Sequence, residues 1–292
     1  MLSFTFYLFP STFIIMRDQA DQLRNLVLRA ARERVSSCGP APRLIVLTGG
    51  KGGVGTTTLS VNLSVALAQQ GQRVVLVDAN PTQADVAPLC GLDERYSVSD
   101  VLQSRRNIHE VLEPGPAGIQ VVPGCWAPKH SGDISSFAQQ RLIAQLTSLG
   151  RHADLVVLDC GSGSSEIVKQ YWQAADQVLL VTTEDSVSIM DAYATIKLLF
   201  CSEEPVSIST LVNQSVDERT ATDVHRRIDT SCGRFLGLRI AAAGHVPLDS
   251  HVPAAAAAGA PLLVQSPTCE AARAIDRLAA VIGSQSSSRA AA

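Results

Sequence analysis

A glycine-rich loop at residues 50–58 constrains the fold of this chain more than any other feature. It lies between an apolar run at 44–47 and a segment, 59–68, whose apolar residues recur with helical periodicity. In this strand–loop–helix setting, backbone N–H groups and the helix N-terminus surround phosphate groups. The sequence therefore predicts a phosphate site formed by Gly50, Lys51, Gly52, Gly53, Val54, Gly55, Thr56, Thr57 and Thr58.

One position of this loop departs from the pattern G-x-x-x-x-G-K-[ST]. Thr56 occupies the place of the lysine, whereas Thr57 keeps the hydroxyl that binds Mg²⁺ in such loops. A charged contact to phosphate contributes about 1.5–3 kcal/mol, and losing a comparable contact in the transition state costs on the order of 10²–10³ in rate. We therefore expect nucleotide binding to be retained but weakened, and hydrolysis to be slow or absent.

Apolar segments typical of buried strands alternate with helical patterns along the rest of the chain. The strand candidates are 44–47, 73–77, 119–122, 155–158, 178–181 and 208–212, and helical patterns include 141–149 and 188–199. This alternation predicts an α/β fold with a doubly wound, mostly parallel sheet. In such sheets ligands bind beyond the carboxyl ends of the strands, and Asp78 and Asp159 follow two of the predicted strands.

The loop resembles the deviant Walker A loop, K-G-G-x-G-K-[ST], of the MinD/ParA family of P-loop ATPases. The resemblance rests on residues 51–55 and on Thr57. It implies an ATP-dependent homodimer in which Lys51 acts in trans, reaching the phosphates held by the other subunit. Lys51 is therefore a candidate catalytic residue.

The same resemblance assigns roles to residues at other strand ends. Asp159 opens a D-x-G-x-G turn typical of the Walker B strand, and Asp78 takes the first position of a D-x-D motif, so both are implied Mg²⁺ ligands. The second position is Asn80, and the catalytic role there is degenerate because an amide cannot take a proton from water. Asn213 matches the asparagine that reads the adenine edge, and Pro247 belongs to the G-x-[IV]-P-x-D turn that packs over the base.

Two further segments are similar to FlhG, also called FleN or YlxH, the MinD-like regulators of flagellar number and placement. Residues 181–197 follow the pattern V-T-x-P-E-x-x-x-x-x-D-A-Y-A-x-I-K, although Glu184 and Asp185 replace the Pro-Glu pair. The N-terminal element D-Q-A-x-x-L-R is matched by Asp18, Gln19, Ala20, Leu23 and Arg24. In that family the element stimulates FlhF, a signal-recognition-type GTPase, which is therefore the implied partner.

The predicted organisation has five parts. Residues 1–15 are uncharged and too short for a membrane span, which favours a non-native leader from a mis-called start; a short membrane-associating leader is the alternative. Residues 16–35 form an amphipathic helix that either binds a partner or docks on its own domain, and 36–42 form a linker. The nucleotide-binding domain spans 43–283. The Ser/Ala-rich tail, 284–292, is expected to be disordered.

The composition argues against some classes of binding partner and indicates the cellular compartment of the protein. The chain of 292 residues has a formal net charge of −3 and no runs of Lys or Arg, which argues against a nucleic-acid interface. Its seven cysteines are scattered singly, which favours reduced packing residues in the cytoplasm over disulfides or zinc ligands. No basic amphipathic segment follows the last predicted helix, which argues against reversible lipid binding. A peripheral position at the inner face of the plasma membrane or the cell pole is the alternative location.

These observations favour an ATP-binding, MinD-like regulator of flagellar number or placement that hydrolyses ATP weakly and acts through an FlhF-type GTPase. Two alternatives stay open. One is an active ATPase switch that cycles between a monomer and an ATP-bound dimer and tolerates Thr56. The other is a ParA-like factor for polar or pilus localisation, against which the element at 18–24 argues.

Overall fold

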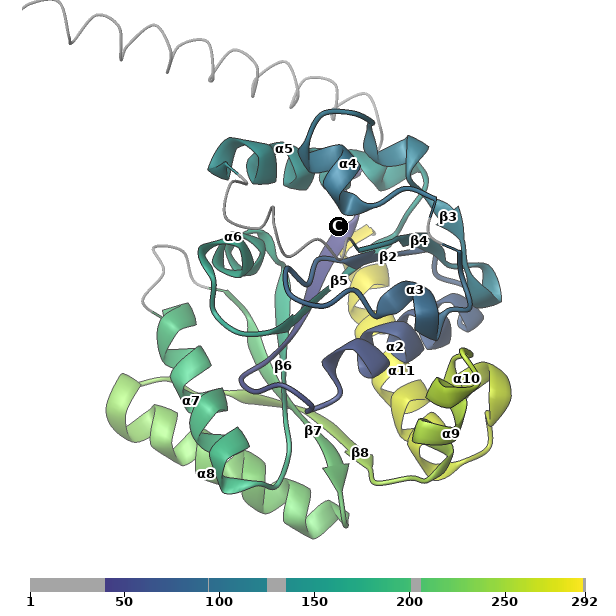
Figure 1. Cartoon of the computed structure of the whole chain (residues 1–292). Helices are drawn as coiled ribbons and strands as arrows, with labels where there is room; N and C mark the ends of the chain where they lie inside the picture. Colours follow the sequence, from purple (N-terminus) through teal and green to yellow (C-terminus); the bar gives the residue numbers. More distant parts are fainter. Residues whose placement is uncertain (1–39, 94, 125–134, 201–205, 291–292) are drawn as a thin grey trace, which may run out of the picture.

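An eight-stranded, mostly parallel sheet organises the part of the chain that the computed structural model describes, residues 40–93, 95–124, 135–200 and 206–290. The strand order is β3-β4-β2-β5-β1-β6-β7-β8, and only the β3–β4 pair is antiparallel (Figure 1). The predicted α/β class with a doubly wound parallel sheet is confirmed. The strands are β1 (Arg43–Gly49), β2 (Val74–Asp78), β3 (Glu113–Pro114), β4 (Gln120–Val122), β5 (Leu155–Ser162), β6 (Gln177–Thr182), β7 (Ile208–Ser215) and β8 (Ala241–Pro247).

The central strands are buried on both faces. Strands β2 and β6 are buried along their whole length, and β1 is buried after its first residue. In β1, Ile45 and Leu47 join the apolar core on one face, whereas Leu44 and Val46 join the core on the other. Strands buried in this way need apolar residues at every position, which is why the sequence pattern located them correctly.

Helices cover both faces of the sheet (Figure 1). The face that contains Ile45 packs against α2 (Thr56–Gln69), α3 (Val86–Leu89), α9 (His251–Ala257), α10 (Leu262–Gln265) and α11 (Glu270–Ala290). The opposite face packs against α4 (Val98–Leu102), α5 (Ser136–Thr147), α6 (Glu166–Ala174), α7 (Ser186–Phe200) and α8 (Glu218–Leu236). Within the described ranges, none of these helices combines the length and apolarity that a membrane span requires.

The structure differs from the sequence prediction in three elements. Strand β8 contains the run Ala-Ala-Ala-Gly and is largely exposed, and β3 has two residues, so neither carries the apolar, β-branched signal of a strand. Helix α11 continues to Ala290, past residue 283, where the sequence analysis ended the nucleotide-binding domain; the expected disorder of the tail stays a prediction. The segment after Gly283 contains no further glycine or proline, and its Ser, Gln, Arg and Ala residues are compatible with a helix.

Candidate nucleotide-binding site

The glycine loop joins the buried end of β1 to the first residue of α2, as predicted. Gly53 and Gly55 have φ values of 82° and 87°, in the left-handed region that glycine adopts at little cost. Gly55 is the N-cap of α2, and the helix has neither a side-chain cap nor an acidic residue in its first turn. The first N–H groups of α2 therefore have no capping side chain, and an anion is the natural partner for them.

The end of β7 supports this loop from one side. The amide nitrogen of Asn213 donates to the carbonyl oxygen of Val54 at 2.8 Å, and Gln214 Nε2 donates to Gly53 O at 3.4 Å. A Cβ atom added to Gly55 would lie 2.4 Å from Asn213 Nδ2. Asn213 thus holds the phosphate-binding loop, a contact that the sequence did not reveal; its reading of the adenine edge stays a prediction.

Lys51 forms an ion pair within its own chain. Its Nζ lies 2.9 Å from Asp185 Oδ2, and the two side chains are 44% and 48% exposed. Asp185 Oδ2 also accepts from the backbone N–H of Ser188 near the start of α7. The hydrogen bond from Lys51 is the main reason that the pKa of Asp185 lies below its usual value. Asp185, which directly precedes α7, therefore holds the Lys51 side chain at the molecular surface.

Two carboxylates lie side by side at the carboxyl ends of β2 and β5. Asp78 and Asp159 are partners in the parallel register and are both completely buried. Oδ1 of Asp159 accepts from Ser60 Oγ at 3.3 Å and from the N–H of Gly161 at 3.2 Å, whereas Oδ2 is buried without a hydrogen-bond partner. Burial raises the pKa of Asp159 to about 6. Hydrogen bonds to the carboxylate oppose this rise, and the one from the Thr57 side chain has the largest effect.

Asp78 has a similar environment. Its carboxylate accepts from the N–H groups of Val86 at 3.2 Å and Asn80 at 3.3 Å. Burial, followed by repulsion from Asp159, raises the pKa of Asp78 well above its usual value. Two buried carboxylates that repel each other, one with an unpartnered oxygen, together with the Thr57 hydroxyl form the all-oxygen donor set that suits Mg²⁺. These three predicted metal residues therefore lie together and fit the ion.

Asn80 is occupied by local contacts. Its Oδ1 accepts from the N–H of Thr82 at 3.0 Å and from Thr82 Oγ1 at 2.8 Å, which closes a turn after β2. Its Nδ2 lies against Gly161, where an added Cβ would approach to 2.3 Å. The side-chain oxygen of Asn80 is therefore already hydrogen-bonded within the turn, and the side-chain amide has no basic atom that could take a proton from water.

Thr56 is buried at the start of α2, with 5% of its surface exposed. Its hydroxyl lies beside the end of β1, because a Cβ added to Gly49 would be 2.8 Å from Thr56 Oγ1. The backbone carbonyl of Thr56 accepts from Ser60 Oγ at 3.0 Å. At the position where the loop pattern has a lysine, the site thus presents a short neutral side chain.

A cavity of about 680 Å³ lies over the loop, within the size range of small-ligand sites. Its lining includes most of the predicted ligand residues: Lys51, Gly52, Gly53, Gly55, Thr56, Thr57, Thr58, Asn80 and Asn213. Its apolar lining residues include the predicted Pro247 together with Leu248, Val252, Pro253, Ala256, Leu262 and Ile275, and Asp249 also lines it. The sequence did not single out these apolar residues, because they resemble ordinary core positions. The polar lining suits phosphates and the apolar lining a flat heterocycle.

Some predicted residues lie outside this cavity. Asp78 and Asp159 are completely buried and do not line it. Gly50 packs against α7, where an added Cβ would approach the Asp191 carbonyl carbon to 2.5 Å, and Val54 is a core residue. The leader at 1–15, the helix at 16–35 and the partner element at 18–24 all lie outside the described residues. Their roles stay predictions.

Comparison with known proteins identifies the family. A family model described as "AAA domain" matches residues 42–200. The antiactivator FleN of Pseudomonas aeruginosa is 34% identical over 210 residues, which cover 72% of this chain and 75% of FleN. The flagellum site-determining protein YlxH of Helicobacter pylori is 28% identical over 184 residues, 63% of this chain and 62% of YlxH.

The fold is likewise similar to a solved structure, the septum site-determining protein MinD of Pyrococcus horikoshii complexed with Mg-ADP. The TM-score is 0.69 at 22% identity, over 82% of this chain and 96% of that one. Together with the loop, the paired carboxylates and the cavity, these similarities show that the chain belongs to the MinD/ParA family of P-loop ATPases, and within it to the FlhG/FleN/YlxH group.

Proposed function

We propose that this protein is an ATP- and Mg²⁺-binding regulator of flagellar number or placement whose ATP hydrolysis is weak. The observation that carries the proposal is the combination of an intact phosphate loop and buried Mg²⁺ carboxylates with Thr56 and Asn80 at the two chemical positions. The names of two relatives, the antiactivator FleN and the flagellum site-determining protein YlxH, support the flagellar assignment.

Different residues of the chain bind the phosphates and the Mg²⁺ ion. The N–H groups of the loop and the first turn of α2 bind the phosphates, while Asp78 and Asp159, with the Thr57 hydroxyl, hold Mg²⁺. When bound, the ion neutralises charge on the phosphate oxygens. Thr56 offers the phosphates a hydroxyl without charge, so nucleotide binding survives but transition-state charge is poorly stabilised. Asn80 cannot act as a general base, because it has no basic atom.

The exposed position of the Lys51 side chain supports a second candidate function, an ATP-dependent switch between a monomer and a homodimer. This side chain is half exposed beside the cavity and is held by one surface ion pair with Asp185. Exchange of that pair for phosphates on a second subunit requires no rearrangement of the core. We propose that the homodimer forms with ATP bound and that it presents the element at 18–24 to an FlhF-type GTPase in the cytoplasm.

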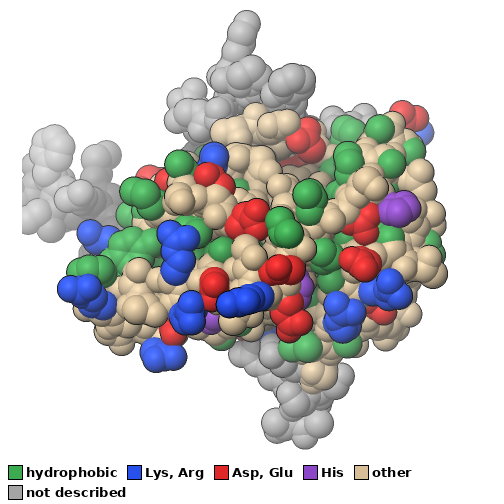
Figure 2. Space-filling view, turned by 90° about the horizontal axis from the view of Figure 1, so that it is seen from below, with side chains coloured by type: hydrophobic (Ala, Val, Ile, Leu, Met, Phe, Trp, Pro, Cys, Tyr) green, Lys and Arg blue, Asp and Glu red, His purple; other side chains and the backbone are tan. Residues whose placement is uncertain are grey.

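Nucleic acid is not among the proposed partners. On the face shown in Figure 2, Lys and Arg side chains are interspersed with Asp and Glu rather than gathered into one basic patch. The formal net charge of −3 agrees with this distribution. A protein that binds DNA mainly through phosphates needs the opposite arrangement.

Calorimetric titration of the full chain with ATP tests nucleotide binding. We expect one site per chain whose affinity falls at least tenfold when EDTA removes Mg²⁺, and falls again in Thr57→Ala, because the hydroxyl is a proposed Mg²⁺ ligand. Thr222→Ala, on the exposed side of α8, is the matched control and should bind as the native chain does. Absence of heat at millimolar ATP with Mg²⁺ would refute the proposal.

A further inference from the structure

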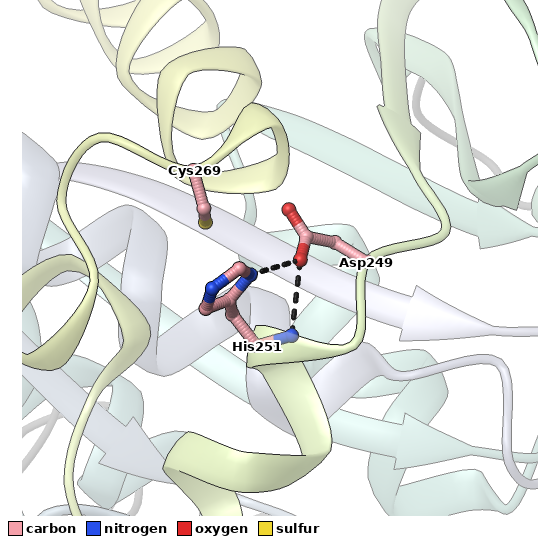
Figure 3. Close-up of side chains that lie close together, drawn as sticks. All are labelled: Asp249, His251 and Cys269. Atoms are coloured by element: carbon pink, nitrogen blue, oxygen red, sulfur yellow. Dashed lines mark hydrogen bonds and ion pairs between the residues drawn. The ribbon is translucent and has the colours of Figure 1, made fainter.

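Three side chains with different metal-binding atoms converge after β8 (Figure 3), and one of them, Asp249, also lines the cavity. Asp249 follows β8, His251 is the first residue of α9, and Cys269 directly precedes α11. One carboxylate oxygen, one imidazole nitrogen and the thiol sulfur all lie within 4.8 Å of one another. The cluster is separate from Asp78 and Asp159, the proposed Mg²⁺ ligands.

The carboxylate of Asp249 is held in place by backbone hydrogen bonds. Its Oδ1 accepts from the backbone N–H of His251 at 3.0 Å, and its Oδ2 accepts from the N–H of Ala271 at 3.2 Å. The same Oδ1 lies 2.7 Å from His251 Nδ1, and the Cys269 thiol is a further hydrogen-bond partner of the carboxylate. Two of these contacts run through protons of the imidazole and the thiol, and a divalent cation can replace such protons.

The spacing and exposure fit a tetrahedral ion. Zinc bonds of about 2.0–2.3 Å place ligand atoms roughly 3.3–3.8 Å apart. The 2.7 Å pair of Asp249 Oδ1 and His251 Nδ1 must therefore widen, and any separation near the 4.8 Å limit must shorten by about 1–1.5 Å. The His251 side chain is 57% exposed, whereas that of Asp249 is 10% exposed. Histidine can therefore swing onto an ion that enters from solvent, while the carboxylate stays in place. Mg²⁺ is a poor occupant, because sulfur and imidazole prefer softer ions.

We propose that Asp249, His251 and Cys269 form a zinc site, with water as the fourth ligand. Binding breaks the S–H bond of Cys269 and forms an S–Zn bond, and the proton passes to the buffer. The imidazole stays neutral: its Nδ1 proton is exchanged for one on Nε2, and the Nδ1 lone pair binds the ion, while the carboxylate binds through one oxygen. Val252 of α9 and Ile275 of α11 both line the cavity, so an ion bound by His251 and Cys269 would link the two helices that carry these lining residues.

Cobalt serves as the spectroscopic probe, since Co²⁺ occupies zinc sites and a thiolate ligand gives it a charge-transfer absorption band. The full chain is stripped of metal, kept reduced with a phosphine, and titrated with Co²⁺ in excess Mg²⁺ without nucleotide. We expect one equivalent of Co²⁺ per chain, a thiolate band, and loss of that band when Zn²⁺ is added.

Variants assign the signal to the three residues. Cys269→Ser should remove the band, and His251→Ala should weaken Co²⁺ binding at least tenfold. His109→Ala is the matched control and should change nothing; the His109 and His152 rings lie 5.2 Å apart, so this variant also excludes that pair as the source. A missing band, a band that persists in Cys269→Ser, or unchanged affinity in His251→Ala would overturn the proposal.

Thermal unfolding followed by circular dichroism gives a second, independent measurement. Zn²⁺ should raise the unfolding midpoint of the native chain and of His109→Ala, because an ion that binds the folded state stabilises it. It should leave the midpoint of Cys269→Ser unchanged, and the far-ultraviolet spectrum of that variant shows whether it is folded. An unchanged midpoint in the native chain would contradict the site.

Discussion

Replacing Gly55 by alanine tests how the phosphate loop is held, and Gly53→Ala provides a matched control. The two glycines have nearly the same left-handed φ, 87° and 82°. An added Cβ at Gly55 would lie 2.4 Å from Asn213 Nδ2, whereas a Cβ at Gly53 meets no atom within 4 Å. Both variants incur the backbone penalty of about 1–2 kcal/mol, but Gly55→Ala must also displace Asn213.

That displacement breaks the 2.8 Å hydrogen bond from Asn213 to Val54, whose net contribution is about 0.5–1.5 kcal/mol. Urea unfolding without nucleotide should therefore show a loss of about 1–2 kcal/mol for Gly53→Ala and about 1.5–3.5 kcal/mol for Gly55→Ala. In a double-mutant cycle, Asn213→Ala should lessen the cost of Gly55→Ala, because the clash partner is gone. Equal costs for the two glycines, or additive effects of Gly55→Ala and Asn213→Ala, would refute this account of the loop.

Two further predictions concern assembly and partner. Asp185→Ala should release Lys51 and favour the ATP-bound dimer, whereas Lys51→Ala should abolish that dimer; sedimentation velocity with and without ATP measures both, and unchanged dimerisation in Lys51→Ala would contradict the role in trans. A peptide spanning 16–34 should stimulate GTP turnover of an FlhF-type GTPase, and Gln19→Ala should abolish the effect because a glutamine can orient the attacking water. A peptide without effect, beside an active full chain, would place the activity elsewhere.

The sequence predicted the elements whose physical signal is local. Strands β2 and β5 are buried on both faces, so their apolar runs identified them, and parallel neighbours end at the same edge of the sheet, so Asp78 and Asp159 were expected together. Strand β8 was missed because an exposed edge strand needs no continuous apolar face. Helix α11 extends past the predicted domain end at residue 283 because no glycine or proline after Gly283 terminates it, and the expected disorder of the tail stays a prediction.

Contacts between side chains that lie far apart in the chain depend on the tertiary structure, so they could not be predicted from the sequence. The hydrogen bond from Asn213 to Val54 joins residues 159 positions apart, and the ion pair of Lys51 with Asp185 joins residues 134 apart. Cys269 was read as a packing residue because no other cysteine or histidine lies near it in the sequence. The fold brings it beside His251 and Asp249, so chain separation hid the cluster.

Steady-state phosphate release tests the central claim, that ATP is bound but hydrolysed weakly because of Thr56 and Asn80. The comparison is between the native chain, Thr56→Lys, Asn80→Asp and the double variant, with Thr57→Ala added to the double variant to measure contaminating activity. Since each change restores a different part of one transition state, we expect the double variant to exceed both single variants and to turn over ATP at least about 10²-fold faster than the native chain. A native chain that already hydrolyses ATP as fast as the double variant would contradict the account and establish the active switch instead.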